Sequence, residues 1–261
     1  MLCQEIIEVL EEHSPGACAL EWDNVGLLAG RRDREVRRVM IALDAVDDVI
    51  EQAVRSEADM LLTHHPLIYG ARKSVNTDDC VGRKLVKLIQ ADISYYAMHT
   101  NFDVMGMAQL SAEKLGLVPD YVLEETMTDG LGQSQGIGRY GKLPERMELG
   151  RFAEYVKECF GLEHVRVCGA LDTLIENVAV SGGSGKSMVE PALRAGADVL
   201  VSGDFDHHTV LDAVAEGLCI IDAGHFGTEK MFVPYMSSYL KRTCPGLDIL
   251  EAVQEEPFHY M

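Results

Sequence analysis

Four of the nine histidines occur as adjacent pairs, His64-His65 and His207-His208. Each pair comes soon after an apolar stretch that predicts a buried strand. In open parallel sheets the carboxyl ends of the strands form the ligand crevice, so a side chain just past a strand end faces that crevice from rigid backbone. Pro66 restricts His65 to extended geometry. Adjacent residues that leave a strand can diverge toward two nearby points, which suits two metal ions better than one.

Two further segments place a carboxylate four residues after a histidine. HTNFD contains His99 and Asp103, and HFGTE contains His225 and Glu229. If each carboxylate lies in the first turn of a helix, it can point at the same centre as its histidine. Imidazole nitrogen and carboxylate oxygen without thiolate suit Zn, Mn, Fe, Co or Ni, and a carboxylate can also bridge two ions.

These patterns define a candidate metal site. It consists of His64, His65, Asp103, His225 and Glu229. His99 is either a sixth ligand or a partner that orients a ligand. The segment SGDFDHH begins a helix, so His207 and His208 could cap that helix together with the neighbouring aspartates. They could also be metal ligands themselves, but contact with substrate or with a ligand that they orient is favoured over that role.

The run SGGSGKS, residues 181–187, partly matches a phosphate-binding loop. It follows a predicted strand, precedes a predicted helix and contains Gly185-Lys186-Ser187. The full GxxxxGK[ST] pattern needs glycine at position 180, where the chain has Val180. The run therefore predicts either a tight turn or a weak site for an anionic group.

The single tryptophan, Trp22, lies in the segment EWDNVGLLAG. One interpretation is packing: Trp22 fills the edge of a core while Asp23 and Asn24 build a turn. The other interpretation is a wall that stacks on a flat substrate. The sequence leaves both open.

Apolar strands and amphipathic helices alternate along the chain, which predicts parallel α/β units. The expected strands are 36–44, 58–63, 93–98, 178–181, 199–202 and 219–223, and the expected helices are 4–12, 47–56, 82–90, 108–115, 151–160, 188–195, 210–216 and 230–241. The segment from Glu124 to Pro144 is rich in Gly, Thr, Ser and Gln and is expected to form loops and turns around a short extended run.

Two segments of the first half resemble two segments of the second half in the same order. AVRSEADMLLT (Ala53–Thr63) matches ALRAGADVLVS (Ala192–Ser202), and YAMHTNFD (Tyr96–Asp103) matches DAGHFGTE (Asp222–Glu229). Such self-similarity predicts an internal duplication. We expect two similar α/β halves, 1–125 and 126–261, with the metal site in the cleft between them and with freedom for the halves to interleave in space.

The composition excludes several classes of protein. With 23 Lys and Arg against 42 Asp and Glu, the net charge is −19, which disfavours nucleic acid as a partner. No stretch approaches the roughly 20 apolar residues of a membrane span, and MLCQEIIEVLEE is acidic and amphipathic, so no secretion signal is expected in it. The seven cysteines include no CxxC pair, so reduced thiols and a cytoplasmic location are expected.

Five motifs occur here in the order typical of a known family. EWDNVGLLAG, LLTHHPLIY, HTNFD, GIGRYG and DAGHFGTE span nearly the whole chain. The sequence resembles the Nif-three-like family of dinuclear-metal proteins, whose members carry the label GTP cyclohydrolase I type 2 homologue. The resemblance implies the same five metal ligands, an α/β duplication and a toroidal homohexamer. Larger members carry an inserted middle domain, for which Met105–Leu149 is too short.

The resemblance and the ligand set together predict a function. We expect two divalent metal ions per chain in a metal-dependent hydrolase that acts on a nucleotide or similar phosphorylated small molecule. His99 and His208 are the candidate proton shuttles. The alternative is a non-catalytic metal-binding hexameric scaffold or regulatory protein, because ligands define a metal site and not a reaction.

Overall fold

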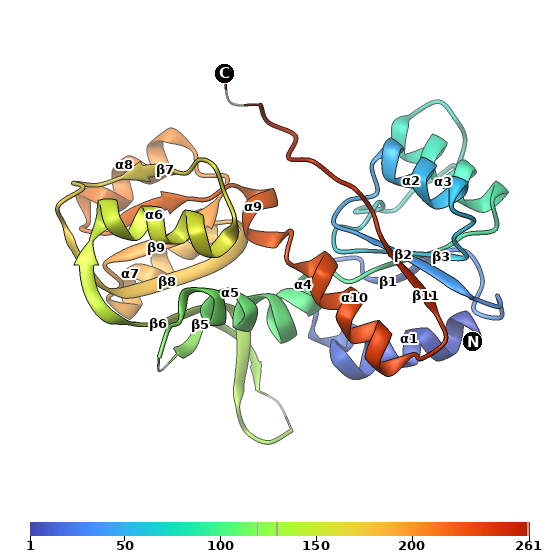
Figure 1. Ribbon diagram of the computed structural model, residues 1–261, viewed down its shortest axis with the longest axis horizontal. Coiled ribbons are helices and arrows are strands. Elements are labelled where there is room, and N and C mark those ends of the chain that lie inside the picture. Colours follow the sequence, from blue (N-terminus) through green and yellow to red (C-terminus); the bar gives the residue numbers. More distant parts are fainter. Residues whose placement is uncertain (119, 129, 260) are drawn as a thin grey trace. The chain divides into compact units, whose positions relative to one another are not determined.

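The chain divides into two units, each built around one β-sheet. A computed structural model describes residues 1–118, 120–128, 130–259 and 261 (Figure 1). Unit 1 comprises Met1–Phe102 together with Met231–Met261, and unit 2 comprises Asp103–Lys230. Parallel strands alternate with helices in both units, which confirms the predicted α/β class. Among the described residues, no helix combines the length and apolar character that a membrane crossing requires.

The sheet of unit 1 has the strand order β1-β4-β3-β2-β11. All neighbouring pairs are parallel except β1 and β4. The strands are β1 (Gly26–Ala29), β2 (Arg38–Ala42), β3 (Met60–Thr63), β4 (Ser94–Ala97) and β11 (Asp248–Glu251). Strands β3 and β4 are buried along their whole length, as expected for apolar strands with both faces covered.

Helices cover both faces of the unit 1 sheet. They are α1 (Cys3–His13), α2 (Asp47–Arg55), α3 (Cys80–Gln90) and α10 (Phe232–Thr243), with the short helices η1 (Gly16–Cys18) and α4 (Thr100–Phe102). Figure 1 shows α2 and α3 on one face and α1 and α10 on the other. Val49, Ile50 and Ala53 of α2 form a core with Met40 and Leu61 of the sheet, because helical spacing places all three on one side of α2.

The sheet of unit 2 has the order β5-β6-β8-β9-β10-β7. Its strands are β5 (Asp120–Thr128), β6 (Ser134–Glu148), β7 (Arg166–Cys168), β8 (Leu174–Ser184), β9 (Val199–Gly203) and β10 (Cys219–Asp222). Its helices are η2 (Asp103–Met107), α5 (Ala108–Leu115), α6 (Leu149–Phe160), η3 (Lys186–Met188), α7 (Val189–Ala195), α8 (His207–Ala215) and α9 (His225–Glu229). Strands β8, β9 and β10 are parallel and form the centre of the sheet.

The segment from Glu124 to Pro144 differs from its prediction. It forms most of the antiparallel pair β5 and β6 instead of loops. Its glycines permit the pairing: a Cβ atom on Gly136 would lie 2.0 Å from the carbonyl oxygen of Glu124, and Gly138 has φ +68°. The glycines that suggested turns therefore allow two backbones to approach closely within a sheet.

The two units differ in extent from the predicted halves 1–125 and 126–261. The C-terminal segment Met231–Met261 belongs to unit 1. The physical reason is strand pairing, since β11 adds to the edge of the first sheet in parallel with β2. Unit 2 is thus a continuous segment of chain enclosed between the two parts of unit 1.

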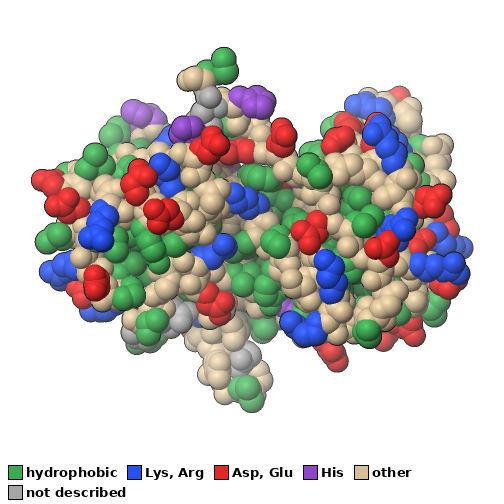
Figure 2. Space-filling view, in the orientation of Figure 1, with side chains coloured by type: hydrophobic (Ala, Val, Ile, Leu, Met, Phe, Trp, Pro, Cys, Tyr) green, Lys and Arg blue, Asp and Glu red, His purple; other side chains and the backbone are tan. Residues whose placement is uncertain are grey.

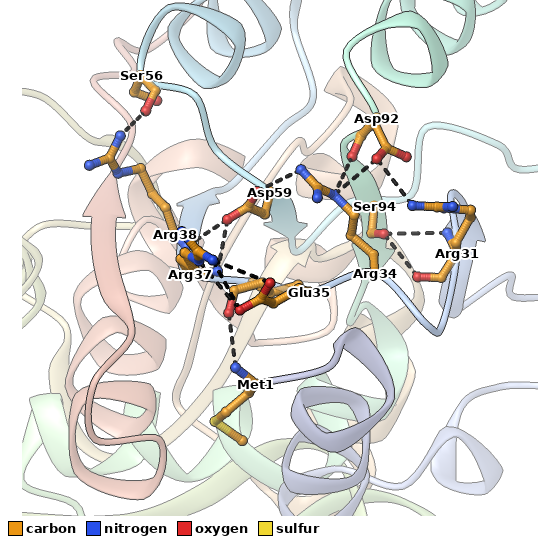
Figure 3. A network of polar contacts seen from close by, with 11 residues as sticks. Met1, Arg31, Arg34, Glu35, Arg37, Arg38, Ser56, Asp59, Asp92 and Ser94 are labelled. Carbon is orange, nitrogen blue, oxygen red and sulfur yellow. Dashed lines mark hydrogen bonds and ion pairs between the residues drawn. The ribbon is translucent and has the colours of Figure 1, made fainter.

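Asp59 anchors the start of two parallel strands in unit 1 (Figure 3). Its Oδ2 accepts hydrogen bonds from the backbone N–H groups of Arg37 at 2.8 Å and Arg38 at 3.1 Å, next to the start of β2. Its Oδ1 lies 2.7 Å from Nη2 of Arg34. One carboxylate thereby satisfies backbone donors on β2 and a guanidinium from the preceding loop.

The arginine-rich segment 31–38 is largely neutralised by acidic neighbours. Four of its arginines pair with carboxylates, namely Arg31, Arg34, Arg37 and Arg38. On the face drawn in Figure 2, basic and acidic side chains are interspersed. This segment therefore does not offer the free positive charge that binding to a phosphate backbone requires.

Asp198 of unit 2 repeats the contacts of Asp59. Its Oδ2 accepts from the backbone N–H groups of Glu176 at 2.9 Å and Asn177 at 2.7 Å, within β8. Both aspartates immediately precede a central parallel strand, β3 in unit 1 and β9 in unit 2. The similarity of AVRSEADMLLT to ALRAGADVLVS is therefore matched by the same hydrogen bonds in the two units, which supports an internal duplication.

The second sequence match is displaced by one residue from the strand register. Thr63 pairs with Ala97 in unit 1, and Ser202 pairs with Asp222 in unit 2. Ala97 thus corresponds to Asp222, whereas the sequence comparison set Tyr96 against Asp222. One additional residue in the turn after β10 accounts for the displacement.

Candidate metal centre

His64 and His65 directly follow β3, at the carboxyl end of a central strand of unit 1. The His64 side chain is fully buried. Its Nδ1 lies 2.8 Å from the carbonyl oxygen of Met98. Because a carbonyl oxygen only accepts, Nδ1 carries the proton and Nε2 carries the lone pair that can bind a metal ion.

His65 is held in the same manner by a carboxylate. Its Nδ1 lies 2.8 Å from Oδ1 of Asp44, which follows the neighbouring strand β2. The turn is fixed by Tyr95, whose hydroxyl lies 2.8 Å from Oγ1 of Thr63 and donates to the carbonyl oxygen of His65 at 3.0 Å. A carboxylate on Nδ1 fixes the ring orientation and raises the basicity of Nε2 as a ligand.

His99, two residues after β4, also has its Nδ1 on a carboxylate. Oδ1 of Asp23 lies 2.9 Å from that nitrogen. Oδ2 of Asp23 accepts from the backbone N–H of Thr100 at 2.9 Å and from its hydroxyl at 2.5 Å. Burial raises the pKa of the Asp23 carboxyl, but the hydrogen bonds from His99 and Thr100 outweigh burial and hold this pKa well below its usual range. Asp23 is therefore ionised at neutral pH and orients His99.

Unit 1 brings three predicted site residues together. One ring nitrogen from each of His64, His65 and His99 lies within 4.8 Å of the other two. The ring centroids are 4.8 to 5.4 Å apart. Since Nδ1 of each ring faces an acceptor, Nε2 is the nitrogen that each can offer to a metal ion. The structure therefore places His99 among the possible ligands and not at a distance from them.

Unit 2 brings together the remaining three candidates. Nε2 of His225 lies 3.0 Å from Oε2 of Glu229, one turn further along α9. Glu229 is buried, and one of its oxygens lies within 4.8 Å of an oxygen of Asp103 at the start of η2. Glu229 thus lies close to both His225 and Asp103, and imidazole nitrogen and carboxylate oxygen are suitable donors for a divalent cation.

The charge state of His225 reflects its two acidic neighbours. Its Nδ1 lies 2.7 Å from Oδ2 of Asp204. Burial lowers the pKa of His225, but Glu229 and Asp204 outweigh burial through hydrogen bonds and charge and raise the pKa to about 9. A divalent cation that binds Nε2 of His225 would replace the proton that this nitrogen shares with Glu229.

The glycine-rich run 181–187 forms the end of β8 and the start of η3, and it lies against Glu229. A Cβ atom on Gly183 would lie 2.3 Å from Oε1 of Glu229 and 3.3 Å from Nε2 of His225, and the residue has φ +65°. The N–H of Gly183 donates to Oγ1 of Thr228 at 3.0 Å. Lys186 pairs with Asp206 at 2.7 Å. The predicted tight turn is wrong, because residues 181–184 continue β8 beyond a register irregularity and Lys186 already belongs to η3. The pairing of Lys186 with Asp206 also gives no support for the predicted anion site.

His207 and His208 are exposed at the start of α8. Asp206 caps this helix by accepting from the backbone N–H groups of His208 at 3.1 Å and Thr209 at 3.0 Å. Among the described residues, the groups of side chains that could hold a metal ion include neither histidine. The predicted cap is confirmed for Asp206, and the shuttle role of His208 remains a prediction.

Comparison with known proteins identifies the family. The family model described as Duf34/NIF3 (NGG1p interacting factor 3) matches residues 1–257. The chain belongs to the DUF34/NIF3 family. A protein of Clostridium perfringens named "GTP cyclohydrolase 1 type 2 homolog" is 33% identical over 266 residues, and the alignment covers 100% of this chain and 100% of the relative. A protein of the same name from Clostridium acetobutylicum is 34% identical over 240 residues, covering 91% of this chain and 89% of the relative.

The DUF34/NIF3 fold also extends over the whole chain. The crystal structure of a Bacillus cereus protein related to NIF3 matches with a TM-score of 0.91 and 26% sequence identity, covering 100% of this chain and 99% of that chain. The resemblance to the Nif-three-like family that the motifs predicted is therefore confirmed, as is its α/β fold.

The residues that orient the histidines were not predicted from the sequence. They are Asp23, Asp44 and Asp204, together with Gln254, which contacts the backbone of Asp44. Asp44 could have been found, because it follows β2 in the way that His65 follows β3, and adjacent parallel strands end at the same edge of a sheet. Asp23 and Asp204 lie in irregular segments whose paths the sequence does not indicate.

Proposed function

We propose that this chain binds two divalent metal ions and acts as a metal-dependent hydrolase on a nucleotide or similar phosphorylated small molecule. The proposed ligands are His64, His65, Asp103, His225 and Glu229. Nitrogen and oxygen donors suit Zn, Mn, Fe, Co or Ni. The names of the Clostridium relatives support a cyclohydrolase-like reaction, in which water opens the imidazole ring of a purine.

The main support is the set of three imidazoles that unit 1 orients toward one another. Each has its Nδ1 within 2.9 Å of an acceptor, on Met98, Asp44 or Asp23. Carbonyl and carboxylate acceptors on Nδ1 are typical of metal-binding histidines. A buried imidazole N–H needs an acceptor in any role, so the support comes from the convergence of the three rings, each with one nitrogen within 4.8 Å of the other two.

Bound divalent ions lower the pKa of water and stabilise developing negative charge. This chain's own residues would orient the ligands and move protons. Asp23 holds a proton on Nδ1 of His99, so a transferred proton would be accepted or released at Nε2 of His99. His208, exposed on α8, is the second proposed shuttle.

Elemental analysis of the purified protein tests the metal site first. We expect about two ions per chain in the unaltered protein, and a loss of metal in His64→Ala and Glu229→Ala. His164→Ala is the matched control, because His164 is exposed and belongs to none of the metal-type groups among the described residues. Equal metal content in all four proteins would contradict the proposal.

Turnover is tested separately with GTP and other nucleotides in the presence of Zn, Mn or Fe. We expect hydrolysis that depends on the added metal and is reduced in Glu229→Gln. The control is Glu216→Gln, an exposed residue at the end of α8. Unchanged metal content together with unchanged turnover in Glu229→Gln would contradict the catalytic role. Metal binding without any turnover would instead identify a metal-binding scaffold.

The family resemblance also supports self-association, and we propose a homohexamer. Light scattering coupled to size-exclusion chromatography would then give six times the chain mass of 28.8 kDa. A mass equal to one chain at micromolar concentration would contradict this assembly.

A further inference from the structure

Two exposed aromatic side chains flank His99 in unit 1. Trp22 is 62% exposed and Tyr69 is 57% exposed. Their ring centroids lie 5.9 Å and 6.0 Å from that of His99, with interplanar angles of 73° and 89°. The exposure of Trp22 is too large for a residue that fills the edge of a core. The packing interpretation of Trp22 is therefore wrong.

Hydrogen bonds fix the segments that carry these two rings. Asp23, the residue after Trp22, holds His99 and Thr100 through both carboxylate oxygens. Asn24 donates from Nδ2 to the carbonyl oxygen of Ile68 at 2.6 Å, directly before Tyr69. Trp22 is thus positioned next to His99 through Asp23, and the segment before Tyr69 is tied to the segment of Trp22 through Asn24.

We infer that Trp22 and Tyr69 are the residues that select the substrate, by stacking on a planar heteroaromatic ring beside His99. This inference rests on the proposed function, because the ring in question is that of the proposed nucleotide substrate, which would lie next to His99. Large aromatic side chains usually bury about 150–250 Å² each, so two that stay exposed beside a polar site leave flat apolar area for a ligand. Stacking tolerates different rings, because every base presents a π-face.

The charges of the chain favour recognition of the ring over recognition of a phosphate. The glycine-rich run 181–187 lacks the full phosphate-loop pattern, and its Lys186 is paired with Asp206. The net charge of −19 also disfavours a highly anionic ligand. A nucleoside should therefore bind about as tightly as the corresponding triphosphate.

Because Trp22 is the only tryptophan, its intrinsic fluorescence reports directly on stacking. The probes are guanosine, GTP and ribose 5-phosphate, titrated into the full chain with and without added Zn. We expect guanosine and GTP to quench Trp22 with similar dissociation constants and ribose 5-phosphate to have no effect. This measurement needs no turnover, so its failure is distinguishable from failure of the hydrolase proposal.

Variants separate stacking from a structural effect. Tyr69→Ala should weaken guanosine binding about tenfold and leave the metal content unchanged, whereas Tyr69→Phe should retain binding. Tyr121→Ala in unit 2 is the control, because Tyr121 is 59% exposed and so similar to Tyr69 in exposure. Calorimetry with Trp22→Phe, which keeps an aromatic face, should still detect guanosine binding.

Three results would overturn the inference. The first is equal affinity of Tyr69→Ala and the unaltered protein for guanosine. The second is quenching by ribose 5-phosphate as strong as that by guanosine. The third is absence of quenching by both guanosine and GTP while the emission of Trp22 shifts to shorter wavelength with protein concentration, which would show that a second copy covers these rings.

Discussion

The side-chain amide of Gln254 hydrogen bonds to both the N–H and the carbonyl group of Asp44. Oε1 of Gln254 lies 3.3 Å from the Asp44 nitrogen and 2.6 Å from that of Leu43, and Nε2 donates to the Asp44 carbonyl oxygen at 3.1 Å. Asp44 in turn holds Nδ1 of His65. A residue near the C-terminus is thus connected to a candidate metal ligand through one intervening residue.

Gln254→Ala should weaken metal binding. Removal of the amide frees the backbone at Asp44, and groups that orient metal ligands are commonly worth about 10–100-fold in metal affinity. Competition with a chromophoric chelator measures this affinity. Gln90→Ala, an exposed glutamine at the end of α3, is the control and should bind metal normally. Identical affinities for both variants would mean that Asp44 needs no support from Gln254.

Gly183→Ala should reduce the metal content. The added Cβ atom would lie 2.3 Å from Oε1 of Glu229, so the carboxylate must move away from its position beside His225. A positive φ strains any residue with a side chain, by about 1–3 kcal/mol. Gly196→Ala separates the two effects, because Gly196 has φ +75° and nothing within 4 Å of an added Cβ. Elemental analysis should show loss of metal in Gly183→Ala alone, and equal loss in both would attribute the effect to backbone strain.

Asp59→Asn and Asp198→Asn should each destabilise the protein. In both cases the carboxylate accepts from two backbone N–H groups, which an amide oxygen satisfies less strongly. Loss of such charge-assisted hydrogen bonds costs about 1.5–3 kcal/mol each. Urea denaturation measures the effect, with the exposed Asp212→Asn as the reference. Midpoints that match the reference would show that these contacts do not anchor the strands.

Protonation of His13 should destabilise the fold as the pH is lowered. Its ring nitrogens lie 2.7 Å from Oγ of Ser14 and 2.8 Å from the hydroxyl of Tyr235. Burial, with a smaller contribution from Arg242, lowers the pKa of His13 from its usual 6.5. Since the unfolded state then binds the proton more readily, stability is lost as the pH falls below 6.5.

His13→Gln removes this titration. Between about pH 7 and pH 5, the midpoint temperature of thermal unfolding should therefore fall less steeply for His13→Gln than for the unaltered protein. The exposed His164→Gln keeps the steeper dependence. Parallel curves for all three proteins would contradict the role of His13.

The sequence predicted those parts of the fold and site that depend on local pattern. His64 and His65 follow an apolar strand, and the position of α5 at Ala108–Leu115 agrees with its predicted range. The repeat around Asp59 and Asp198 was also predictable, because the two aspartates make the same backbone hydrogen bonds and lie in segments of similar sequence.

Features that depend on distant parts of the chain were not predictable. Asp23 meets His99 across 76 positions, and Gln254 meets Asp44 across 210. The β5 and β6 pair was missed because glycine favours turns locally, whereas here it permits close backbone contact. Only the folded backbone shows which of these two uses applies.

The division of unit 1 into two segments affects how the protein folds as it is synthesised. Strand β11 and helix α10 come from the last part of the chain, while the strand that β11 pairs with lies near the beginning. Unit 2, as one continuous segment, can fold as soon as it leaves the ribosome. Unit 1 must instead wait until α10 and β11 have been synthesised, so until then the edge of β2 and the apolar face that α10 covers are exposed to chaperones and to aggregation.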